Sequence, residues 1–321
     1  MTPFGTTADG RAVQRIELAA GELTVALLSL GAIIQSVRLD GVAHDLTQGS
    51  DDVADYEGRM RYHGALIGPV VNRITGGEAV IAGQRHGFEK NQDGQHTLHC
   101  GAAGTMLKVW DVVETGPAHA VLALDLPDGE GGFPGNRRVT ARFTLTPPAT
   151  LTLQVTCTTD APTILNFANH SYWNLDGTDR WDGHWLRVAA DRYLPTTGDF
   201  IPTGQIVDVT GTDMDLRQGK AVSVHHPDFD NNYCLSDTRQ PLRDVMWLRG
   251  TSGVSLTMAT TSPGLQVYDG RHAIRPGRAP FEGLAFEAQY WPDATSNPAF
   301  PSVEVPAGGV YDETTQWRFS R

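Results

Sequence analysis

Apolar and polar residues alternate along several stretches of this chain, and this alternation limits its possible folds more than any other feature. The clearest stretch covers residues 139–145, where Val, Ala, Phe and Leu are separated by Thr, Arg and Thr. The same pattern runs through residues 23–27, 151–157 and 254–258. Successive side chains of a β-strand point to opposite faces, so each stretch predicts a strand with one face on a core.

Turn signals separate the predicted strands, whereas helical periodicity is hard to find. Asp-Gly pairs, which favour tight turns, occur at residues 40–41, 93–94, 128–129 and 269–270. The Thr-Pro-Pro-Ala segment at 146–149 predicts a hairpin connection between two of the strands. No low-complexity segment divides the chain. We therefore predict an all-β protein with few or no long helices, in which residues 1–321 form one large β-sandwich domain.

The charge of the chain restricts its partners. It carries 37 acidic against 25 basic residues, a net charge of −12, and the basic residues are scattered. Binding to nucleic acid requires a concentrated basic surface, and so does attraction to an anionic membrane. We therefore expect neither a nucleic acid nor a membrane as a partner.

The cysteines and the apolar runs give an expectation about location. Cys100, Cys157 and Cys234 are an odd number at wide spacings, without a C-x-x-C pair, so no disulfide framework or zinc ribbon is expected. Free thiols fit a reducing compartment. The first residues show no signal peptide, and no apolar run approaches the roughly 18 residues of a membrane span. We expect a cytoplasmic protein.

Five segments gather polar side chains inside otherwise strand-like sequence. Amide, imidazole and guanidinium groups hydrogen-bond to hydroxyl groups, and aromatic rings stack on the apolar faces of sugars. Each segment also has a structural interpretation: a surface arginine in a turn, a buried polar turn with its hydrogen bonds made, or a turn rich in Asp and Asn. The segments are Asn72–Arg73, His96–Gly101, Asn166–Leu175, Asp230–Tyr233 and Phe286–Pro292.

Glu287 stands out in the last of these segments. In a strand it shares one face with Ala285 and Gln289, while Leu284, Phe286 and Ala288 share the other face. A carboxylate among apolar and aromatic neighbours loses solvation, which raises its pKa and suits it to proton transfer. The alternative is a glutamate on an edge strand, in contact with water.

His96 and His99 form a His-x-x-His pattern, which could indicate metal ligands. Residues three apart on a strand face opposite ways, so these two imidazoles should diverge. No further ligand stands at a familiar spacing, and no glycine-rich nucleotide loop is present. We expect neither a metal site nor a cofactor.

Taken together, the segments resemble the aldose 1-epimerase (galactose mutarotase) family over essentially the whole chain. The most specific matches are NHSYWNL at Asn169–Leu175 and the FE-x-Q segment at Phe286–Pro298. Further matches are NRI at 72–74, LH-x-G at 98–101, D-N-N-Y at 230–233 and PGLQVY at 263–268. The resemblance implies a large, twisted β-sandwich with an open cleft, and a cofactor-free isomerase. Its small-molecule substrate would be a free aldose such as galactose or glucose.

The resemblance also implies a role for each matching residue. His170 occupies the position of the general acid, and Glu287 that of the general base. A continuous strand up to His170 would let neighbouring amide or hydroxyl groups orient its imidazole, whereas the turn after His99 should fix that residue less. The positions implied to bind the sugar are Asn72, Arg73, His99, Tyr172, Asp230 and Gln266.

Three other activities are compatible with the same residues. A glycoside hydrolase would use two carboxylates, for which Glu287 and Asp230 are available. A non-catalytic sugar-binding or regulatory protein would not need the matched acid and base. An enzyme acting on hexose 6-phosphates would need more basic residues around the cleft. The sequence does not identify the preferred aldose, and we expect a monomer or a homodimer.

Overall fold

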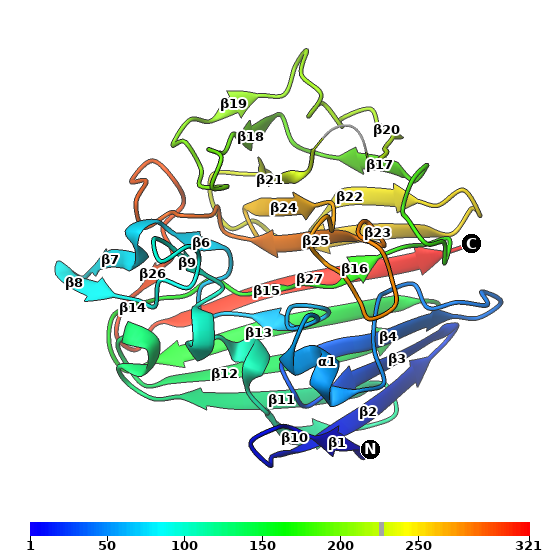
Figure 1. The fold of residues 1–321 in the computed structure, drawn as a ribbon, viewed down its shortest axis with the longest axis horizontal. Helices are drawn as coiled ribbons and strands as arrows, with labels where there is room; N and C mark the ends of the chain where they lie inside the picture. The colour runs from blue at the N-terminus through cyan, green and yellow to red at the C-terminus, as the bar shows by residue number, and fades with distance from the viewer. Residues whose placement is uncertain (225–227) are drawn as a thin grey trace.

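The computed structural model describes residues 1–224 and 228–321, and its regular secondary structure consists almost entirely of β-strands (Figure 1). Its α-helix, α1, covers only Val53–Glu57, and the 3₁₀ turns cover Thr75–Gly77, Gly101–Ala103, Thr105–Leu107 and Glu130–Gly132. None of the helices in the described residues combines the length and the apolar character that crossing a membrane requires. The prediction of an all-β fold is confirmed.

The largest sheet in the described part of the chain has nine strands, each antiparallel to its neighbours. Across the sheet these are β10 (Asp111–Thr115), β11 (His119–Leu126), β12 (Arg137–Thr146), β13 (Thr150–Thr159), β27 (Val310–Ser320), β23 (Ser255–Thr260), β22 (Arg243–Arg249), β17 (Trp185–Val188) and β20 (Lys220–Ala221).

Two smaller sheets and four strand pairs complete the fold. The six-stranded sheet contains, in order, β16 (Tyr172–Trp173), β25 (Leu284–Gln289), β24 (Gly264–Tyr268), β21 (Asp230–Cys234), β18 (Arg192–Leu194) and β19 (Val207–Asp208). The four-stranded sheet contains β1 (Thr2–Thr6), β2 (Ala12–Ala20), β3 (Leu23–Leu28) and β4 (Ile33–Leu39). The pairs are β5 (Leu66–Ile67) with β15 (Ala168–Asn169), β6 (Arg73–Ile74) with β9 (Thr97–Leu98), β7 (Glu78–Ile81) with β8 (Gln84–Gly87), and β14 (Thr163–Ile164) with β26 (Glu304–Val305).

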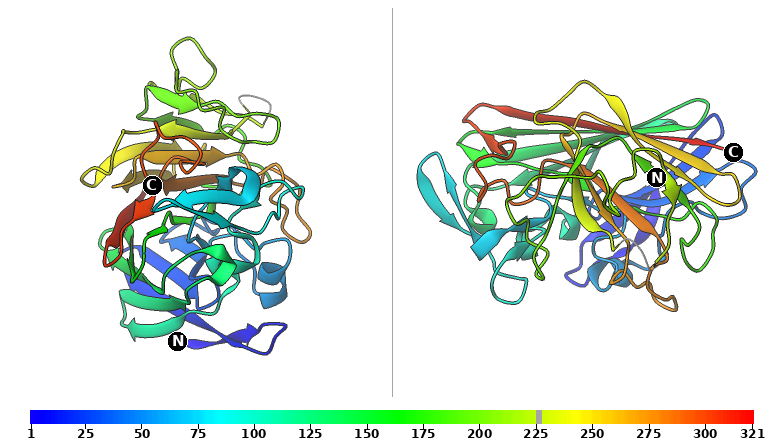
Figure 2. Two further views of the ribbon diagram at one scale, coloured as in Figure 1. Left: turned by 90° about the vertical axis from the view of Figure 1, so that its left-hand side faces the viewer. Right: turned by 90° about the horizontal axis from the view of Figure 1, so that it is seen from above.

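The sheets pack in layers around a shared core. Seen from above, the long strands of the nine-stranded sheet form a curved layer, and α1 and β25 lie to one side of it (Figure 2). One cluster of buried apolar side chains joins the layers, and it includes Val25 of β3, Phe143 of β12, Phe286 of β25 and Trp317 of β27. Removal of this apolar surface from water holds the sheets together.

Strand β12 shows why the alternating pattern predicted strands. Its residues are buried at every second position, so that Val139 and Phe143 face the core while Arg142 is exposed. β12 pairs with β13 as far as Thr146 opposite Thr150, which makes residues 146–149 the predicted hairpin connection. The other alternating stretches lie in β3, β13 and β23, as predicted.

The segment around His170 differs from the prediction of a continuous strand. β15 ends at Asn169 and β16 begins at Tyr172, so His170 and Ser171 lie between two short strands. The side chain of Asn169 accounts for the break: it accepts a hydrogen bond from the Ser171 N–H (3.1 Å) and donates one to the carbonyl of Gly64 (2.7 Å). Such local bonds from an asparagine compete with the hydrogen bonds of a sheet.

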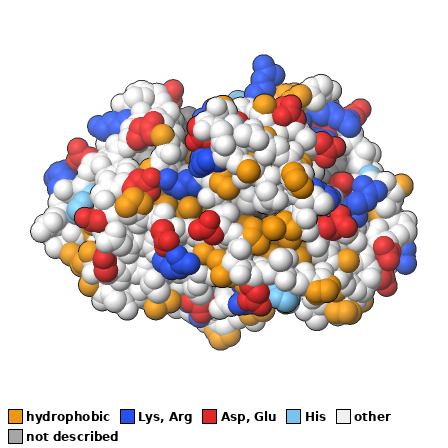
Figure 3. Space-filling view, turned by 90° about the horizontal axis from the view of Figure 1, so that it is seen from below, with side chains coloured by type: hydrophobic (Ala, Val, Ile, Leu, Met, Phe, Trp, Pro, Cys, Tyr) orange, Lys and Arg blue, Asp and Glu red, His pale blue; other side chains and the backbone are white. Residues whose placement is uncertain are grey.

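Charged side chains of both signs are interspersed on the surface. On the face shown in Figure 3, acidic and basic groups alternate with apolar and uncharged ones. Many are ion-paired, as Arg138 is with Asp125 at 2.7 Å.

Candidate active site

A cleft of about 480 Å³ opens where the six-stranded sheet meets the segments around β6, β9 and β16. This volume is typical of a site for a small molecule. All predicted site residues except Gln266 line it, namely Asn72, Arg73, His99, His170, Tyr172, Asp230 and Glu287. Another cavity, of about 450 Å³, lies around Gln48 and Glu282 and contains none of them. The candidate site is therefore the first cleft.

Three neighbouring strands present a polar face to the cleft. In their register, Asn232 of β21 is opposite Gln266 of β24, which is opposite Glu287 of β25. Asp230 lies two paired positions from Asn232 along β21, on the same face of the sheet and opposite Tyr268. Residues that are directly opposite in a sheet share a face, so these side chains lie together. The alternative of a turn rich in Asp and Asn is wrong, because residues 230–233 belong to β21.

Glu287 is not an edge-strand residue in water. Its strand lies between β16 and β24, and only 2% of the residue is exposed. Oε1 is 3.5 Å from Nε2 of His170, and Oε2 has no hydrogen-bond partner among the described residues. Burial raises the pKa of Glu287 to about 8; the negative charge of Asp230 adds to this rise, and Arg73 opposes it. The carboxyl group can therefore both accept and donate a proton near neutral pH.

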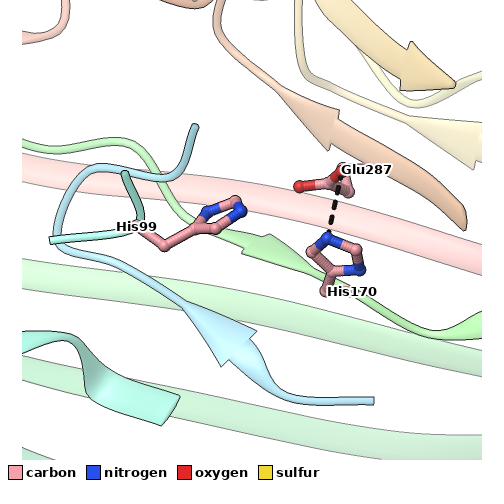
Figure 4. Close-up of side chains that lie close together, drawn as sticks. All are labelled: His99, His170 and Glu287. Atoms are coloured by element: carbon pink, nitrogen blue, oxygen red, sulfur yellow. Dashed lines mark ion pairs between the residues drawn. The ribbon is translucent and has the colours of Figure 1, made fainter. Parts of the chain in front are cut away.

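His170 faces Glu287 from the gap between β15 and β16 (Figure 4). Backbone hydrogen bonds hold its position, since its N–H donates to Ala65 O (2.9 Å) and its carbonyl accepts from Gly64 N (3.0 Å). The ring packs beside Tyr172, with centroids 5.0 Å apart. Burial lowers the pKa of His170 to about 4, and its Nδ1 has no hydrogen-bond partner in the described residues. The backbone thus fixes the position of this residue. The prediction that a neighbouring amide or hydroxyl group orients the ring is not met at Nδ1 by any residue that the structure describes.

His99 is held more firmly than its place before a turn suggested. Its Nδ1 accepts a hydrogen bond from the backbone N–H of Asn72 (3.1 Å), and its ring packs on Tyr62 at 4.7 Å. Burial lowers the pKa of His99 well below its usual value, and the neighbouring His170 and Arg73 act in the same direction. The ring is therefore neutral, and because Nδ1 is an acceptor, the proton is on Nε2. The structure fixes His99 as a hydrogen-bond donor.

His99, His170 and Glu287 point toward one another (Figure 4), and their potential ligand atoms lie within 4.8 Å of one another. The sequence analysis considered His96 with His99 and did not foresee this cluster, to which His96 does not belong. A metal ion needs a free lone pair on each imidazole. The Nδ1 lone pair of His99 is used by Asn72 and its Nε2 carries the proton, so this hydrogen bond opposes metal binding.

Asp230 connects the other predicted sugar-binding residues. Arg73 lies 3.7 Å from one of its carboxylate oxygens, and Nε2 of Gln266 donates to the other at 2.7 Å. Gln266 therefore acts behind Asp230 rather than in the cleft wall. Arg73 also lies over the ring of Phe200, 5.3 Å from its centroid, and is only 9% exposed, so the alternative of a surface arginine is wrong.

Three cleft residues have a left-handed backbone. The φ angles are 65° at Asn72, 52° at His99 and 60° at Phe200. Residues other than glycine rarely adopt this conformation, which costs about 1–3 kcal/mol each and is concentrated at functional sites. At Asn72 and His99 it brings the backbone N–H of one residue to the imidazole of the other.

The NHSYWNL region combines functional and structural residues. Asn166 binds the backbone of Tyr290 through both ends of its amide (2.9 and 3.2 Å), and Asn174 donates to the carbonyl of Glu282 (2.7 Å). These amides are buried and satisfied, as the structural alternative required. His170 and Tyr172, in contrast, reach the cleft.

Sequence reasoning missed several residues of the cleft wall, including Tyr62, His63, Phe200 and Tyr268. The His63 ring lies 4.4 Å from that of Tyr172 and has no hydrogen-bond partner among the described residues. Burial lowers its pKa to about 3. Tyr62 and His63 follow α1 in a turn, and no pattern in the sequence marks that turn as part of a site. Tyr268 could have been found, since it ends the PGLQVY match.

Comparisons with known proteins agree with this geometry. A sequence model of the aldose 1-epimerase family matches residues 14–318. The galactose mutarotase of Rattus norvegicus is 32% identical over 339 residues, which cover 99% of this chain and 98% of the relative. The aldose 1-epimerase of Escherichia coli K12 is 29% identical over 322 residues, 92% of each chain. The solved structure of a GalM/aldose epimerase homologue from C. elegans has a TM-score of 0.89 at 26% identity, covering 97% of this chain and 99% of its own.

The similarity thus extends well beyond the short motifs. It includes every segment that contributes a cleft residue, from Gly58 to Glu287. The chain therefore belongs to the aldose 1-epimerase, or galactose mutarotase, family.

Proposed function

We propose that this member of the family interconverts the α and β anomers of a free aldose such as galactose or glucose, with Glu287 as base and His170 as acid. The observation that carries the proposal is the pair itself. An imidazole and a carboxyl group lie 3.5 Å apart, both nearly fully buried, in a cleft of suitable size for a monosaccharide.

Anomer exchange opens and closes the sugar ring, which requires two proton transfers. Glu287 takes the proton of the C1 hydroxyl while His170 gives a proton to the ring oxygen, and the bond between C1 and that oxygen breaks. The resulting aldehyde rotates about the C1–C2 bond. On closure, His170 takes the proton of the C5 hydroxyl and Glu287 returns one to the former aldehyde oxygen.

The pKa shifts of the pair fit this cycle. Because burial raises the pKa of Glu287 and lowers that of His170, the pair holds one proton over a wide range of pH. The single proton lies mainly on Glu287, whose pKa is the higher of the two, and this is the form that closes the ring. The form with the proton on His170, which opens the ring, is the less populated one. Both forms have the same net charge, so the cycle does not change the charge of a buried site.

The remaining residues would bind and orient the sugar. The Nε2–H of His99 is a fixed donor for an oxygen of the substrate. Asp230 and Arg73 offer an acceptor and a donor for hydroxyl groups, and Gln266 holds Asp230 in place. Asn72 and Tyr172 complete the wall of the cleft.

Two alternative functions fit the geometry less well. In a glycoside hydrolase, Asp230 would be the second carboxylate, but Arg73 and Gln266 already hold it as an acceptor. A non-catalytic sugar-binding protein would have no use for a carboxyl group that is buried beside an imidazole, because removing a carboxylate from water costs free energy.

The test is to add the enzyme to freshly dissolved α-anomers of several aldoses and to follow the approach to equilibrium by polarimetry. A mutarotase accelerates the change of rotation and leaves the equilibrium value unchanged. Release of a new sugar from a glycoside would indicate a hydrolase. Saturable binding without any acceleration would indicate a binding protein.

We further propose a cytoplasmic location, a monomeric or homodimeric state, and a single domain over residues 1–321. All three cysteines are free and buried, which suits a reducing compartment. One apolar cluster contains residues from Ile16 to Phe319, which supports a single folding unit.

A further inference from the structure

A second cavity, of about 450 Å³, lies beside the active cleft and shares no lining residue with it in the described part of the chain. Its wall is formed by residues of the segment 44–51 after β4, by residues that follow β16, and by Arg275 and Glu282 between β24 and β25. Because its volume is close to that of the cleft, it is large enough for a compound of the size of a monosaccharide. We call it the Gln48 cavity, after one of its lining residues.

Several polar side chains in the wall of the Gln48 cavity are buried. Each of five is no more than 6% exposed, namely Gln35, Thr47, Gln48, Asn174 and Glu282. Removing a polar group from water costs free energy unless a hydrogen bond replaces the lost contact. Four of the five make such bonds to other residues of the protein, as Glu282 does with Nε of Arg275 at 2.8 Å. The fold itself therefore accounts for the burial of these four.

Gln48 is the exception among the five. Neither Nε2 nor Oε1 of its amide has a hydrogen-bond partner in the described residues. Its backbone is fixed, because its N–H donates to the carbonyl of Tyr172 at 3.1 Å. Its amide packs against Gly283, where a Cβ atom would lie 2.5 Å from Nε2. The fold thus places an unpaired donor and an unpaired acceptor side by side in the wall of the cavity.

The charged groups of the cavity wall are balanced. Its four arginines each lie within ion-pair distance of a carboxylate: Arg15 of Glu17, Arg38 of Asp45, Arg275 of Glu282 and Arg278 of Asp179. An anion would have to displace one of these carboxylates, and a cation would be repelled by the arginines. The wall therefore favours a ligand without net charge.

We propose that the Gln48 cavity is a second ligand-binding site, for a neutral polyhydroxylated compound of the size of a monosaccharide. A carboxamide offers an acceptor oxygen and a donor nitrogen in one plane, and two adjacent hydroxyl groups of a polyol complement both. Free aldoses belong to this class, and so do cyclic polyols. Binding at this site does not require the anomer exchange proposed for the active cleft.

The active cleft is so close to the Gln48 cavity that binding in one must be distinguished from binding in the other. The carbonyl of Tyr172 accepts hydrogen bonds from Thr47 and Gln48 in the cavity wall, at 3.0 and 3.1 Å, while the ring of Tyr172 lines the cleft. The segment between β24 and β25 also contributes to both, with Arg275 in the cavity and His272 in the cleft. The experiment therefore needs a reporter and a variant for each site.

The experiment follows backbone amide signals of the isotopically labelled full chain by NMR during titration with galactose and, separately, with myo-inositol, which has no anomeric carbon. Gly49 reports on the Gln48 cavity, and His99 reports on the cleft. We expect at least one of the two compounds to shift the Gly49 signal in a saturable way, with a dissociation constant in the millimolar range. A Gly49 shift that stays linear in concentration, or no shift with either compound, would overturn the second site.

Variants assign the binding to the amide. Gln48→Met removes both hydrogen-bonding groups at similar volume and should raise the dissociation constant measured at Gly49 by about tenfold, as expected for the loss of two neutral hydrogen bonds. Gln84→Met on β8, which is exposed and outside the cavity wall, is the matched control and should leave this value unchanged. If Gln48→Met does not fold, Thr178→Tyr, which adds a ring at an exposed position of the wall, should weaken binding at Gly49 in its place.

The reciprocal variant is Asp230→Asn in the cleft. It should weaken the galactose binding measured at His99 and leave the dissociation constant at Gly49 unchanged. A Gly49 shift that persists in Gln48→Met and is lost in Asp230→Asn would come from the cleft and would overturn the second site. The proposed function is tested separately by the change of optical rotation, and its failure would leave binding in the Gln48 cavity unaffected.

Discussion

Nε2 of His170 lies 3.5 Å from Oε1 of Glu287, and the two residues are only 3% and 2% exposed. Each shifts away from its ordinary pKa because water is excluded from both. The carboxyl group becomes a weaker acid and the imidazole a weaker base. Both shifts determine the pH range over which the pair holds a single proton.

The pH dependence should be bell-shaped with a broad top. The limbs should follow the lowered pKa of His170, about 4, and the raised pKa of Glu287, about 8. Below the lower value both residues are protonated and no base remains; above the upper value neither holds a proton and no acid remains. The measurement is kcat/KM from about pH 3 to about pH 10. A single limb near the ordinary histidine pKa of about 6.5 would contradict it.

Glu287→Gln should reduce kcat by about 10²–10⁴-fold, the usual contribution of a positioned proton-transfer group. Glutamine has nearly the same shape and leaves the strand pairing of β25 intact, so circular dichroism and sugar binding should be preserved. Glu304→Gln on β26, an exposed carboxylate, is the matched control and should have near wild-type activity. Near wild-type turnover by the Glu287 variant would remove this residue from the role of base.

His170→Asn and His99→Asn should have different kinetic effects. Loss of the acid should lower kcat strongly with a limited change in KM, whereas loss of the fixed donor should raise KM more and retain more kcat. Both variants need complete kinetics on the same sugar and a folding check. The two roles would have to be exchanged if His99→Asn proved more damaging to kcat while His170→Asn mainly weakened binding.

Gln266→Met should raise KM by about tenfold, because it removes the 2.7 Å hydrogen bond that holds Asp230. Methionine fills a similar volume, so the stability of the fold should change little. Combining it with Asp230→Asn should add less than the sum of the single effects, as expected for residues that act together. Additive effects in this double-mutant cycle would show that Gln266 acts independently of Asp230.

Chelators should leave the activity unchanged. The hydrogen bond from Asn72 to Nδ1 of His99 leaves that imidazole without a lone pair for a metal facing His170 and Glu287. The measurement is the rate after dialysis against EDTA, with and without added divalent metals. If activity were lost and one specific metal restored it, the prediction that the enzyme works without a metal would be wrong.

The sequence predicted the strands whose two faces have different environments. β12 and β13 each have one face in the core, so their alternation is visible. β25 is buried at every position, so exposure does not alternate along it. What alternates is the type of side chain, because polar Glu287 and Gln289 lie between apolar residues. Strands of two residues, such as β15 and β16, were not predictable as separate elements, because contacts from distant segments define them.

The site could be predicted only in part for a related reason. Motifs identified His170 and Glu287 as a pair, and the structure brings them together. The tautomer of His99 depends on a hydrogen bond from the backbone N–H of Asn72, which is 27 residues away in the sequence. This hydrogen bond requires a left-handed backbone at both residues, and no sequence pattern indicates that conformation. The sequence likewise gives no sign that Arg59 differs from other surface arginines, and only the fold shows that it lines the cleft.

The last strand of the chain occupies a central place. β27 pairs with β13 on one side and β23 on the other, so the nine-stranded sheet is two separate sets of strands until β27 enters. During synthesis on the ribosome, one edge of β13 and one edge of β23 therefore stay unpaired until β27 has been made. Unpaired strand edges are prone to aggregation. A ribosome that stalls before Val310 would release a chain with both edges open. For this protein, the efficiency of translation through residues 310–320 should influence how much of it reaches the native state.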